Sequence, residues 1–542
     1  MPHKINSILF GGFLFLLLVV AACDSDITGE RFDNLSPDTQ LSVRDTSLVD
    51  NLVTGDRLSS TVLVSWSGDD PDGFIASFDI RFYSTDDSPA PEDLWTNTVR
   101  NDSLVLLPIP RGNREADVVF EVRAIDNEGN IDPTPAKTVF PIQNAPPEIR
   151  FSNFDLPPDT TFGVFSFAWI ADDPEGIENI DRIEISLNDS LNFIPIDPTI
   201  DFVTLVADVD KQDDLQTETS ARIFAGRGFQ ATSLVAPGLL LDAENTFYIR
   251  AVDQTDTTST VQSFAWHIKK SRGDILYVND FRKSTFPGQQ TFHLGILREY
   301  LPEGTAIDYW DLSTPFVTGS AGNTPRSEFL PGSPDPAIRQ FLAQYEHIYW
   351  VSTNTINNIT SNNLPFVGSV LDIFFDNGGS IMVHSPITLP PNPEDNLGNP
   401  ALLLLPINSL ISFPDSLRPQ LRMSSGTLTS SSTEVPGTGQ MLPVLKPNSL
   451  IFTTLPYSVS GSTNIPLMEG TYSYVTRSGS QGPWFGSTTV ASMSADRRVG
   501  LFTLPLLSES SGEIIFSDEN DDTEAARDAV KLLLEGLNFP QR

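Results

Sequence analysis

Cysteine is almost absent from this sequence of 542 residues, and its scarcity excludes several classes of protein. The single cysteine, Cys23, has no partner for an intramolecular disulfide, so the chain is not a disulfide-stabilised scaffold. Histidine is also scarce, with five residues, which argues against chemistry built on His-rich metal sites. After residue 20, no segment reaches the ~18 continuous apolar residues of a membrane-spanning helix.

Positive charge is in short supply as well. The chain has 33 Lys and Arg against 70 Asp and Glu, for a net charge of −37. Such a surface repels nucleic acid, so we expect no nucleic-acid partner. Neither a Gly-x-Gly-x-x-Gly motif after a strand nor a Gly-Lys-Ser/Thr loop occurs, so nothing supports nucleotide phosphate binding. Hydrophobic residues make up 39%, enough for packed cores in three or four domains of ~100–200 residues.

The first residues have the order of a secretory signal. Lys4 is followed by the apolar run Ile8–Val20 and then by two small residues, Ala21 and Ala22, directly before Cys23. A basic start, a short apolar run and small residues at a cleavage site are typical of signal peptides. The sequence therefore predicts a signal peptide over residues 1–22.

Val20-Ala21-Ala22-Cys23 resembles the lipobox of bacterial lipoproteins. The resemblance implies cleavage before Cys23, acylation of this residue with palmitate-like chains, and an acylated tether over residues 23–37. It places the protein at the cell envelope, and we expect the outer membrane, on its periplasmic face or the cell surface. Asp24 and Asp26 resemble a surface-export signal of the Bacteroidota, although in enterobacteria an Asp after the cysteine retains a lipoprotein at the inner membrane. The alternative is an ordinary signal peptide or an anchor helix with a chance cysteine.

An internal repeat follows the tether. The string VSWSGDDPDGFI at 64–75 returns as FAWIADDPEGI at 167–177, shifted by 103 residues. A later string, FEVRAID at 120–126, returns as FYIRAVD at 247–253. Apolar residues recur at every second position in 62–66, 78–82, 120–124 and 247–251, which predicts antiparallel strands with one buried face. We expect two all-β sandwiches, at 38–145 and 146–270.

The repeated strings resemble the fibronectin type III and related immunoglobulin-like modules of bacterial surface proteins. The resemblance depends on a core tryptophan, Trp66 or Trp169, and on the late strand with its Arg-Ala-x-Asp ending. It implies spacers, adhesive surfaces or carbohydrate binders, because such modules serve all three roles.

The acidic turns also raise a calcium hypothesis. Five carboxylates of the first module could converge at one end of its sandwich: Asp69, Asp70, Asp72, Asp126 and Asp132. Calcium takes six to eight oxygen ligands, which clustered carboxylates supply. The alternative is that Asp is simply a good turn residue. No other cofactor is expected.

From residue 271 short apolar strands alternate with amphipathic helices. This order predicts an α/β domain with a mostly parallel sheet over 271–542 and a Ser/Pro/Gly-rich insertion near 385–490. Strands are expected at 274–280, 306–311, 347–352, 380–384 and 498–505, and helices at 292–300, 336–345, 364–376 and 523–537.

The order of these elements, with Asn377-Gly378-Gly379 leading into a strand, resembles a flavodoxin-like or class I glutamine amidotransferase-like domain. Such an amidotransferase uses a nucleophilic cysteine, and this region has none. Weak substitutes are Ser480, in the string Ser-Gly-Ser-Gln-Gly, and His384, at the end of a strand where α/β sheets bind ligands. A loop serine and a structural histidine are the plainer interpretations.

These observations favour a non-enzymatic envelope lipoprotein. Two β-sandwich spacers would present the α/β domain to a protein or glycan partner, with the membrane reached through the lipid anchor. The alternatives are a hydrolase acting on an envelope or extracellular polymer, and a purely structural spacer.

Overall fold

The computed structural model describes residues 33–43, 57–86, 94–110, 112–281, 288–312, 330–352, 363–387, 400–411, 420–451, 454–476, 478–508 and 511–542. The signal peptide, Cys23 and most of the tether lie outside these residues. No helix in the described ranges is long and apolar enough to cross a membrane. The chain divides into two compact units, Met1–Ala145 and Pro146–Arg542, which are described separately. Strands dominate both units and helices are few.

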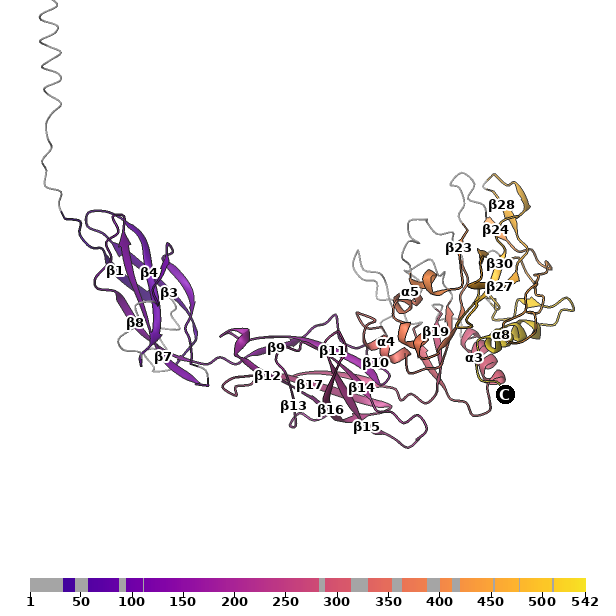
Figure 1. The fold of residues 1–542 in the computed structure, drawn as a ribbon, viewed down its shortest axis with the longest axis horizontal. Helices are drawn as coiled ribbons and strands as arrows, with labels where there is room; N and C mark the ends of the chain where they lie inside the picture. The colour runs from indigo at the N-terminus through magenta and orange to yellow at the C-terminus, as the bar shows by residue number, and fades with distance from the viewer. Residues whose placement is uncertain are drawn as a thin grey trace, which may run out of the picture. The chain divides into compact units, whose positions relative to one another are not determined.

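The first unit contains a β-sandwich, called module 1 (Figure 1). A three-stranded sheet in the order β1-β3-β6 faces a five-stranded sheet in the order β2-β8-β7-β4-β5. The strands are β1 (Asp38–Val43), β2 (Leu58–Ser59), β3 (Thr61–Asp69), β4 (Ile75–Ser84), β5 (Thr96–Thr98), β6 (Asp102–Leu106), β7 (Glu115–Asp126) and β8 (Ala136–Gln143). All pairs are antiparallel except the two-residue pair of β2 and β8.

Alternation along the strands builds the core of module 1. Trp66 of β3 lies 5.9 Å from the ring of Phe120 on β7 and 6.3 Å from that of Phe78 on β4, measured between ring centroids. Its indole Nε1 donates a hydrogen bond to the carbonyl of Arg100 (2.9 Å), which satisfies the one polar atom of the buried ring. The predicted core tryptophan of this module is thus in place.

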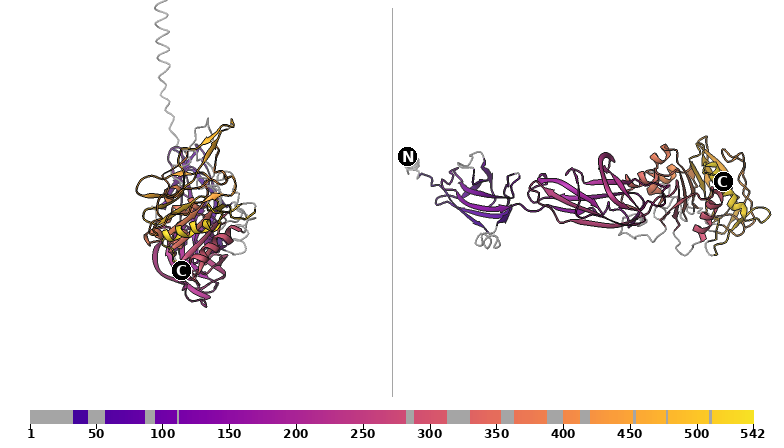
Figure 2. Two further views of the ribbon diagram at one scale, coloured as in Figure 1. Left: turned by 90° about the vertical axis from the view of Figure 1, so that its right-hand side faces the viewer. Right: turned by 90° about the horizontal axis from the view of Figure 1, so that it is seen from below.

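Residues 146–270, called module 2, form a second sandwich (Figures 1 and 2). Its sheets have the orders β10-β18-β17-β12-β13 and β16-β15-β14-β11-β9. The strands are β9 (Glu148–Phe151), β10 (Thr160–Thr161), β11 (Val164–Asp172), β12 (Ile180–Leu187), β13 (Ile194–Ile196), β14 (Phe202–Ala207), β15 (Glu218–Ala225), β16 (Gln230–Leu240), β17 (Ala243–Asp253) and β18 (Gln262–Ile268), with a 3-10 turn η2 (Ile177–Asn179).

Aromatic side chains from both sheets fill module 2. Phe167 of β11 stacks on Phe247 of β17, with ring centroids 4.0 Å apart, and Phe165 lies 4.9 Å from Trp266 of β18. Trp169, the counterpart of Trp66, is buried in the same cluster. The predicted pair of β-sandwich modules is therefore confirmed.

Residues 271–542, called the C-terminal region, are built on a mixed sheet. Its five parallel strands have the order β20-β19-β21-β22-β31, and antiparallel strands β30, β26 and β23 extend it, with β27 also pairing β30. The strands are β19 (Ile275–Asp280), β20 (Ile307–Asp311), β21 (His347–Ser352), β22 (Ser380–His384), β23 (Ser409–Leu410), β26 (Tyr457–Ser458), β27 (Asn464–Glu469), β30 (Thr489–Ser494) and β31 (Val499–Phe502).

Short strands outside this sheet complete the region. A three-stranded sheet pairs β24 (Gln420–Arg422), β28 (Ser473–Val475) and β29 (Gln481–Pro483), and β25 (Lys446–Pro447) pairs β32 (Phe516–Ser517). Most of these strands, with β23, β26, β27 and β30, come from the chain between β22 and β31, where the insertion was expected. This stretch therefore adds antiparallel strands to a parallel core.

Helices cover both faces of the parallel strands. The helices are α3 (Gly288–Tyr300), α4 (Ala337–Leu342), α5 (Leu364–Gly368), α6 (Asp372–Asp376), α7 (Pro400–Leu404) and α8 (Glu524–Gly536). On one face His293 of α3 contacts Tyr349 of β21, and α3 lies beside α8 (Figure 1). On the other face Phe341 of α4 contacts Trp310 of β20. The single helix predicted over 364–376 is wrong, because the chain leaves the helix at Gly368-Ser369 and resumes it at Asp372.

Candidate functional site

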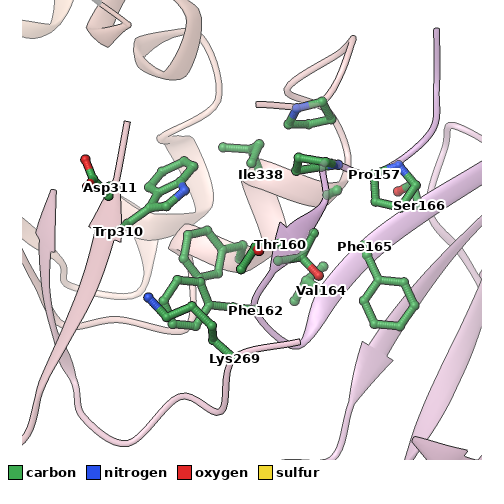
Figure 3. Close-up of a pocket in the computed structure, with 15 residues that line it drawn as sticks. Pro157, Thr160, Phe162, Val164, Phe165, Ser166, Lys269, Trp310, Asp311 and Ile338 are labelled. Carbon is green, nitrogen blue, oxygen red and sulfur yellow. The ribbon is translucent and has the colours of Figure 1, made fainter. Parts of the chain in front are cut away.

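A pocket lies where module 2 meets the C-terminal region (Figure 3). Its volume is about 230 Å³, and its wall is mostly apolar. Module 2 contributes Pro157 and Phe162, while the C-terminal region contributes Trp310, Ile338 and Phe341. All of them belong to one compact unit, Pro146–Arg542. Pockets between packed elements that combine an apolar wall with a few polar groups are typical ligand sites.

Local structure explains how these aromatic rings meet. The two-residue strand β10 pairs in parallel with the end of β18, which directs Phe162 out of module 2. The Phe162 ring stacks on Phe341 of α4, with centroids 4.9 Å apart, and joins the core of the C-terminal region. Trp310 meets Phe341 edge-on at 5.2 Å. The pocket therefore has rigid aromatic walls.

One cationic group lines the pocket. Nζ of Lys269 donates a hydrogen bond to the carbonyl of Tyr309 (2.7 Å) and lies 5.2 Å from the centre of the Phe162 ring. Burial lowers the pKa of Lys269, and the carboxylates of Asp308 and Asp311 oppose that shift. Asp311 also lines the pocket. The pocket can thus hold an apolar group, and Lys269 and Asp311 place one positive and one negative charge at its wall.

The carboxyl ends of the parallel strands form a second candidate site. Asp280, Ser352 and His384 end β19, β21 and β22. Asp280 is fully buried, and its carboxylate accepts hydrogen bonds from Trp350 Nε1 (3.3 Å) and from Asn363 Nδ2 (2.6 Å). Ser352 and His384 line a small cavity of about 30 Å³, which has room for water.

His384 is placed by contacts that lie far away in the sequence. Its Nε2 donates to the carbonyl of Leu504 (2.8 Å), which leaves Nδ1 as an acceptor. Nδ1 is buried and has no hydrogen-bond partner among the described residues. Burial lowers the pKa of His384 to about 4, and the bond to Leu504 opposes this. The ring centroid of His293 on α3 lies 4.7 Å from that of His384. Two imidazoles with lowered pKa values therefore meet at the end of β22.

Ser480 lies in a different place from His384. It sits in the turn between β28 and β29, where its backbone N–H donates to Oγ1 of Thr476 (3.0 Å), and its side chain is exposed. It does not line the cavity beside His384. The two weak catalytic candidates are thus not brought together around that cavity.

The five acidic residues of module 1 have different surroundings. Desolvation raises the pKa of Asp70, and the charges of the nearby Asp72 and Asp126 raise it further. Asp126 is held by Nδ2 of Asn34 (2.5 Å) and by the backbone of its own turn, while Asp132 accepts from Oγ1 of Thr134 (2.8 Å). Asp69 ends β3. Across the described ranges, no group of three or more His, Cys, Asp or Glu side chains is placed to hold a metal ion.

The equivalent turn in module 2 carries another pair of carboxylates, Asp173 and Glu175, and burial together with the nearby Glu175 raises the pKa of Asp173 to about 7. Sequence reasoning singled out the turns of module 1 and missed this pair, although the repeat of Asp-Asp-Pro-Glu-Gly at 172–176 was a visible signal. The junction pocket had no such signal. Its residues are separated by more than a hundred positions, and no local pattern shows that Phe162 leaves its own module.

Comparisons with known proteins place no family on this chain. No family model matches it, and no curated protein matches it either. Similar solved structures include the fibronectin(III)-like modules of Clostridium thermocellum CbhA (10% identity, 43% of this chain, 96% of that chain, TM-score 0.16). They also include the FN1-FN3 domains of chicken CNTN1 (10% identity, 44% and 68%, TM-score 0.20) and the chicken interferon gamma receptor alpha chain (11% identity, 44% and 100%, TM-score 0.20). At such TM-scores the likeness supports no argument by itself, and the sandwich architecture rests on the sheets described above.

Proposed function

We propose that this protein is a non-enzymatic, lipid-anchored component of the bacterial envelope that binds another protein. Two fibronectin type III-like modules act as spacers, and an α/β domain at the far end of the chain provides the binding region. The observation that carries the proposal is the aromatic pocket of about 230 Å³ between module 2 and the C-terminal region. No activity is needed to explain a rigid, mostly apolar pocket with a single cation at its wall.

The strand order supports an α/β domain of the flavodoxin-like kind. Numbered along the chain, the parallel strands β20-β19-β21-β22-β31 have the order 2-1-3-4-5, which is the flavodoxin-like order. We further propose that this domain is related to the class I glutamine amidotransferases and lacks their nucleophilic cysteine. The antiparallel extension after β22 is then an elaboration of that core.

The chemistry of the pocket favours a protein segment over a glycan. A sugar ring needs many hydrogen-bonding partners around its hydroxyl groups, and this wall is mostly apolar. A cavity of 150 Å³ holds benzene, so about 230 Å³ fits one large apolar side chain. The net charge of −37 attracts cationic partners. We therefore assign as occupant one aromatic or branched side chain from a basic segment of a partner protein.

Peptide binding tests this assignment. The probes are arrays of ten-residue peptides with one central Trp, Phe or Leu, flanked by Lys and Arg or by Asp and Glu, together with a glycan array. We expect the purified protein to bind basic peptides with a central large apolar residue. Trp310→Ala, which opens the wall, and Thr160→Trp, which fills the pocket, should each weaken binding about tenfold or more.

Phe485→Ala is the matched control, because Phe485 is 91% exposed in the same region and does not line the pocket. Its affinity should equal that of the unchanged protein. Binding to glycans alone, or peptide binding that survives both pocket variants, contradicts the proposed occupant. No binding to any probe favours the structural-spacer alternative.

The lipid anchor has its own test. Several acyl chains on Cys23 anchor a protein stably, because each buried CH₂ contributes about 0.8 kcal/mol. Cys23→Ala should move the protein from the membrane fraction to the soluble fraction, whereas Ser25→Ala should leave it with the membrane. Retention of the Cys23→Ala protein after a high-salt wash would contradict lipidation at this residue.

One observation favours the hydrolase alternative. Nδ1 of His384 is buried without a hydrogen-bond partner among the residues that the structure describes, and His384 lines the same small cavity as Ser352, whose hydroxyl proton this nitrogen would accept. A hydrolase built on these residues predicts labelling of Ser352 by a fluorophosphonate probe, lost in Ser352→Ala and in His384→Gln. Absence of labelling in the unchanged protein counts against it.

A further inference from the structure

The three-stranded sheet β24-β28-β29 presents one of its faces to solvent. Figure 1 shows β24 and β28 at the end of the C-terminal region away from α3 and α8. Leu421 of β24 and Tyr474 of β28 pair across this sheet, and both pack against the core of the C-terminal region. Alternate residues of a strand lie on opposite faces of its sheet. The residues on either side of this pair therefore form the outer face.

Two rows of side chains cross the three strands on this outer face. Three of the six residues are exposed and three are half-buried. The amide groups of its two Gln residues donate and accept hydrogen bonds, and the hydroxyl group of its Ser can accept them. The six residues, called the polar sheet face, are Arg422, Ser473 and Pro483 in one row and Gln420, Val475 and Gln481 in the other.

An exposed aromatic ring lies beside the polar sheet face. The backbone N–H of Trp484 donates to the carbonyl of Tyr472 (2.9 Å), so strand pairing continues past Pro483. Trp484 packs partly against the core, whereas Phe485 is 91% exposed. By the same alternation, Phe485 lies on the side of the sheet that carries Pro483. A phenylalanine ring left in water is stabilised by contact with the apolar side of a ligand.

The cation of the polar sheet face has no anionic partner in the described part of the chain. Nε of Arg422 is buried without a hydrogen-bond partner there, and no carboxylate of the described residues forms an ion pair with this side chain. Residues 416–433 and 470–495 contain three Arg and no Asp or Glu, in a chain that has 70 acidic residues. The polar sheet face thus complements an anionic ligand, unlike the acidic remainder of the protein.

We propose that the polar sheet face and Phe485 bind a polysaccharide that contains uronic acid residues. A pyranose ring has an apolar side formed by its C–H groups, which matches the ring of Phe485, and hydroxyl groups that match the Gln and Ser side chains. The planar guanidinium of Arg422 matches a sugar carboxylate, because its N–H groups form a fork. None of these residues lines the aromatic pocket, so the proposal goes beyond peptide binding and does not depend on it.

The composition of this surface favours a sugar over a protein partner. Phe485 is its one large and exposed apolar side chain among the residues named above. Protein interfaces are built around an apolar centre to which several large side chains contribute. Scattered amide and hydroxyl groups around a single ring fit a sugar better, because each hydroxyl group of the ligand then finds a hydrogen-bonding partner.

Isothermal titration calorimetry with the purified protein at pH 7.5 tests the proposal. The probes are an oligogalacturonate of about ten sugar residues and its methyl ester, which keeps the rings and loses the charges. We expect saturable binding of the acid form and at least tenfold weaker binding of the ester, although the net charge of −37 by itself would favour the ester. Phe485→Ala and Arg422→Gln should each weaken binding of the acid form about tenfold.

Leu403→Ala and Arg150→Gln are the matched controls. Leu403 of α7 is 82% exposed, and Arg150 of β9 is exposed, so these variants remove an apolar side chain and a cation elsewhere. Both should bind the acid form like the unchanged protein, and Trp310→Ala in the pocket should do so too. Because Phe485 is exposed, its variant should keep the original melting temperature, so a loss of binding there is not a loss of folding.

Three results overturn the proposal: no binding of the acid form, equal binding of the ester, or unchanged binding of the acid form in both site variants. Basic-peptide binding that Phe485→Ala abolishes would assign the surface to a protein partner and would overturn it as well. Peptide binding that only the pocket variants weaken, together with oligogalacturonate binding that only Phe485→Ala and Arg422→Gln weaken, supports two separate sites.

Discussion

The C-terminal region has two buried imidazoles, those of His293 and His384, and a half-buried one, that of His347. Burial lowers the pKa of both His347 and His384 to about 4, and it lowers that of His293 well below its usual value. His347 stacks on Phe539, and its Nδ1 meets Oγ of Ser380 at 2.9 Å. All three rings are therefore neutral at pH 7, with His347 and His384 on strands of the parallel sheet and His293 on α3.

The sign of the resulting pH dependence follows from these pKa values. A histidine of the unfolded chain has a pKa near 6.5, above the folded value of about 4 for His347 and His384. Between these limits the unfolded chain binds more protons, so stability is complete above pH ~6.5 and is lost as the pH falls toward 4. The full shift at His384 corresponds to ~3 kcal/mol.

His384→Gln tests this dependence, because the amide can still donate to the carbonyl of Leu504 and does not titrate. Denaturant unfolding at pH 4.5 and pH 7.5 should show a smaller loss of stability in acid for the variant than for the unchanged protein. His267→Gln, on the half-buried strand β18, is the control and should keep the original acid sensitivity. An identical loss in His384→Gln would show that His384 does not carry this effect.

At the level of elements, sequence patterns identified most strands and failed where contacts are long-range. Alternation in 62–66 and 247–251 identified the strands β3 and β17, because one face of each sheet must be buried. A different signal, a short continuous apolar run, identified β21 and β22. The antiparallel extension after β22 was not predicted, since β23 and β26 have only two residues each, too few to show a period in the sequence.

The same limit applies to the candidate site. The end of a predicted strand placed His384 at the carboxyl edge of the sheet, but its partner Leu504 follows 120 residues later. The helix expected over 364–376 was amphipathic throughout, yet Gly368 and Ser369 are weaker helix formers and the chain divides there into α5 and α6. Hydrophobic periodicity predicts which face of a helix is buried, but it does not predict where the helix is interrupted.

The turn from α6 into β22 provides a test at this scale. Gly379 approaches the ring of Phe374 so closely that an added Cβ would collide with it. Gly379→Ala should therefore force Phe374 or the start of β22 to move, which costs about 1–3 kcal/mol of stability by denaturant unfolding. Gly228→Ala, in a more open turn of module 2, should cost less. Equal stability of Gly379→Ala and the unchanged protein would mean that this contact is loose.

For the whole molecule, the boundary between compact units lies after Ala145. The boundary between module 2 and the C-terminal region does not separate two units, because side chains pack across it. The chain from Pro146 to Arg542 is one compact unit even though it contains a sandwich and a mixed sheet. Phe162 joins the core of the C-terminal region, and Lys211 of module 2 pairs with Asp274 (2.7 Å) directly before β19. Because both parts share buried aromatic surface, they should unfold together, and module 1 should unfold separately.

Scanning calorimetry of the full-length protein tests this division. We expect two transitions, one for module 1 and a larger one for the rest of the described fold. Phe162→Ala removes a ring that is 6% exposed and stacked on Phe341. The free energy of unfolding of the larger unit should fall by about 3–5 kcal/mol, and its single transition should divide into two. Phe78→Ala, in the core of module 1, should lower only the smaller transition. If Phe162→Ala leaves the larger transition whole, the junction and its pocket do not couple the two parts, and the pocket is better explained as a gap between independent domains.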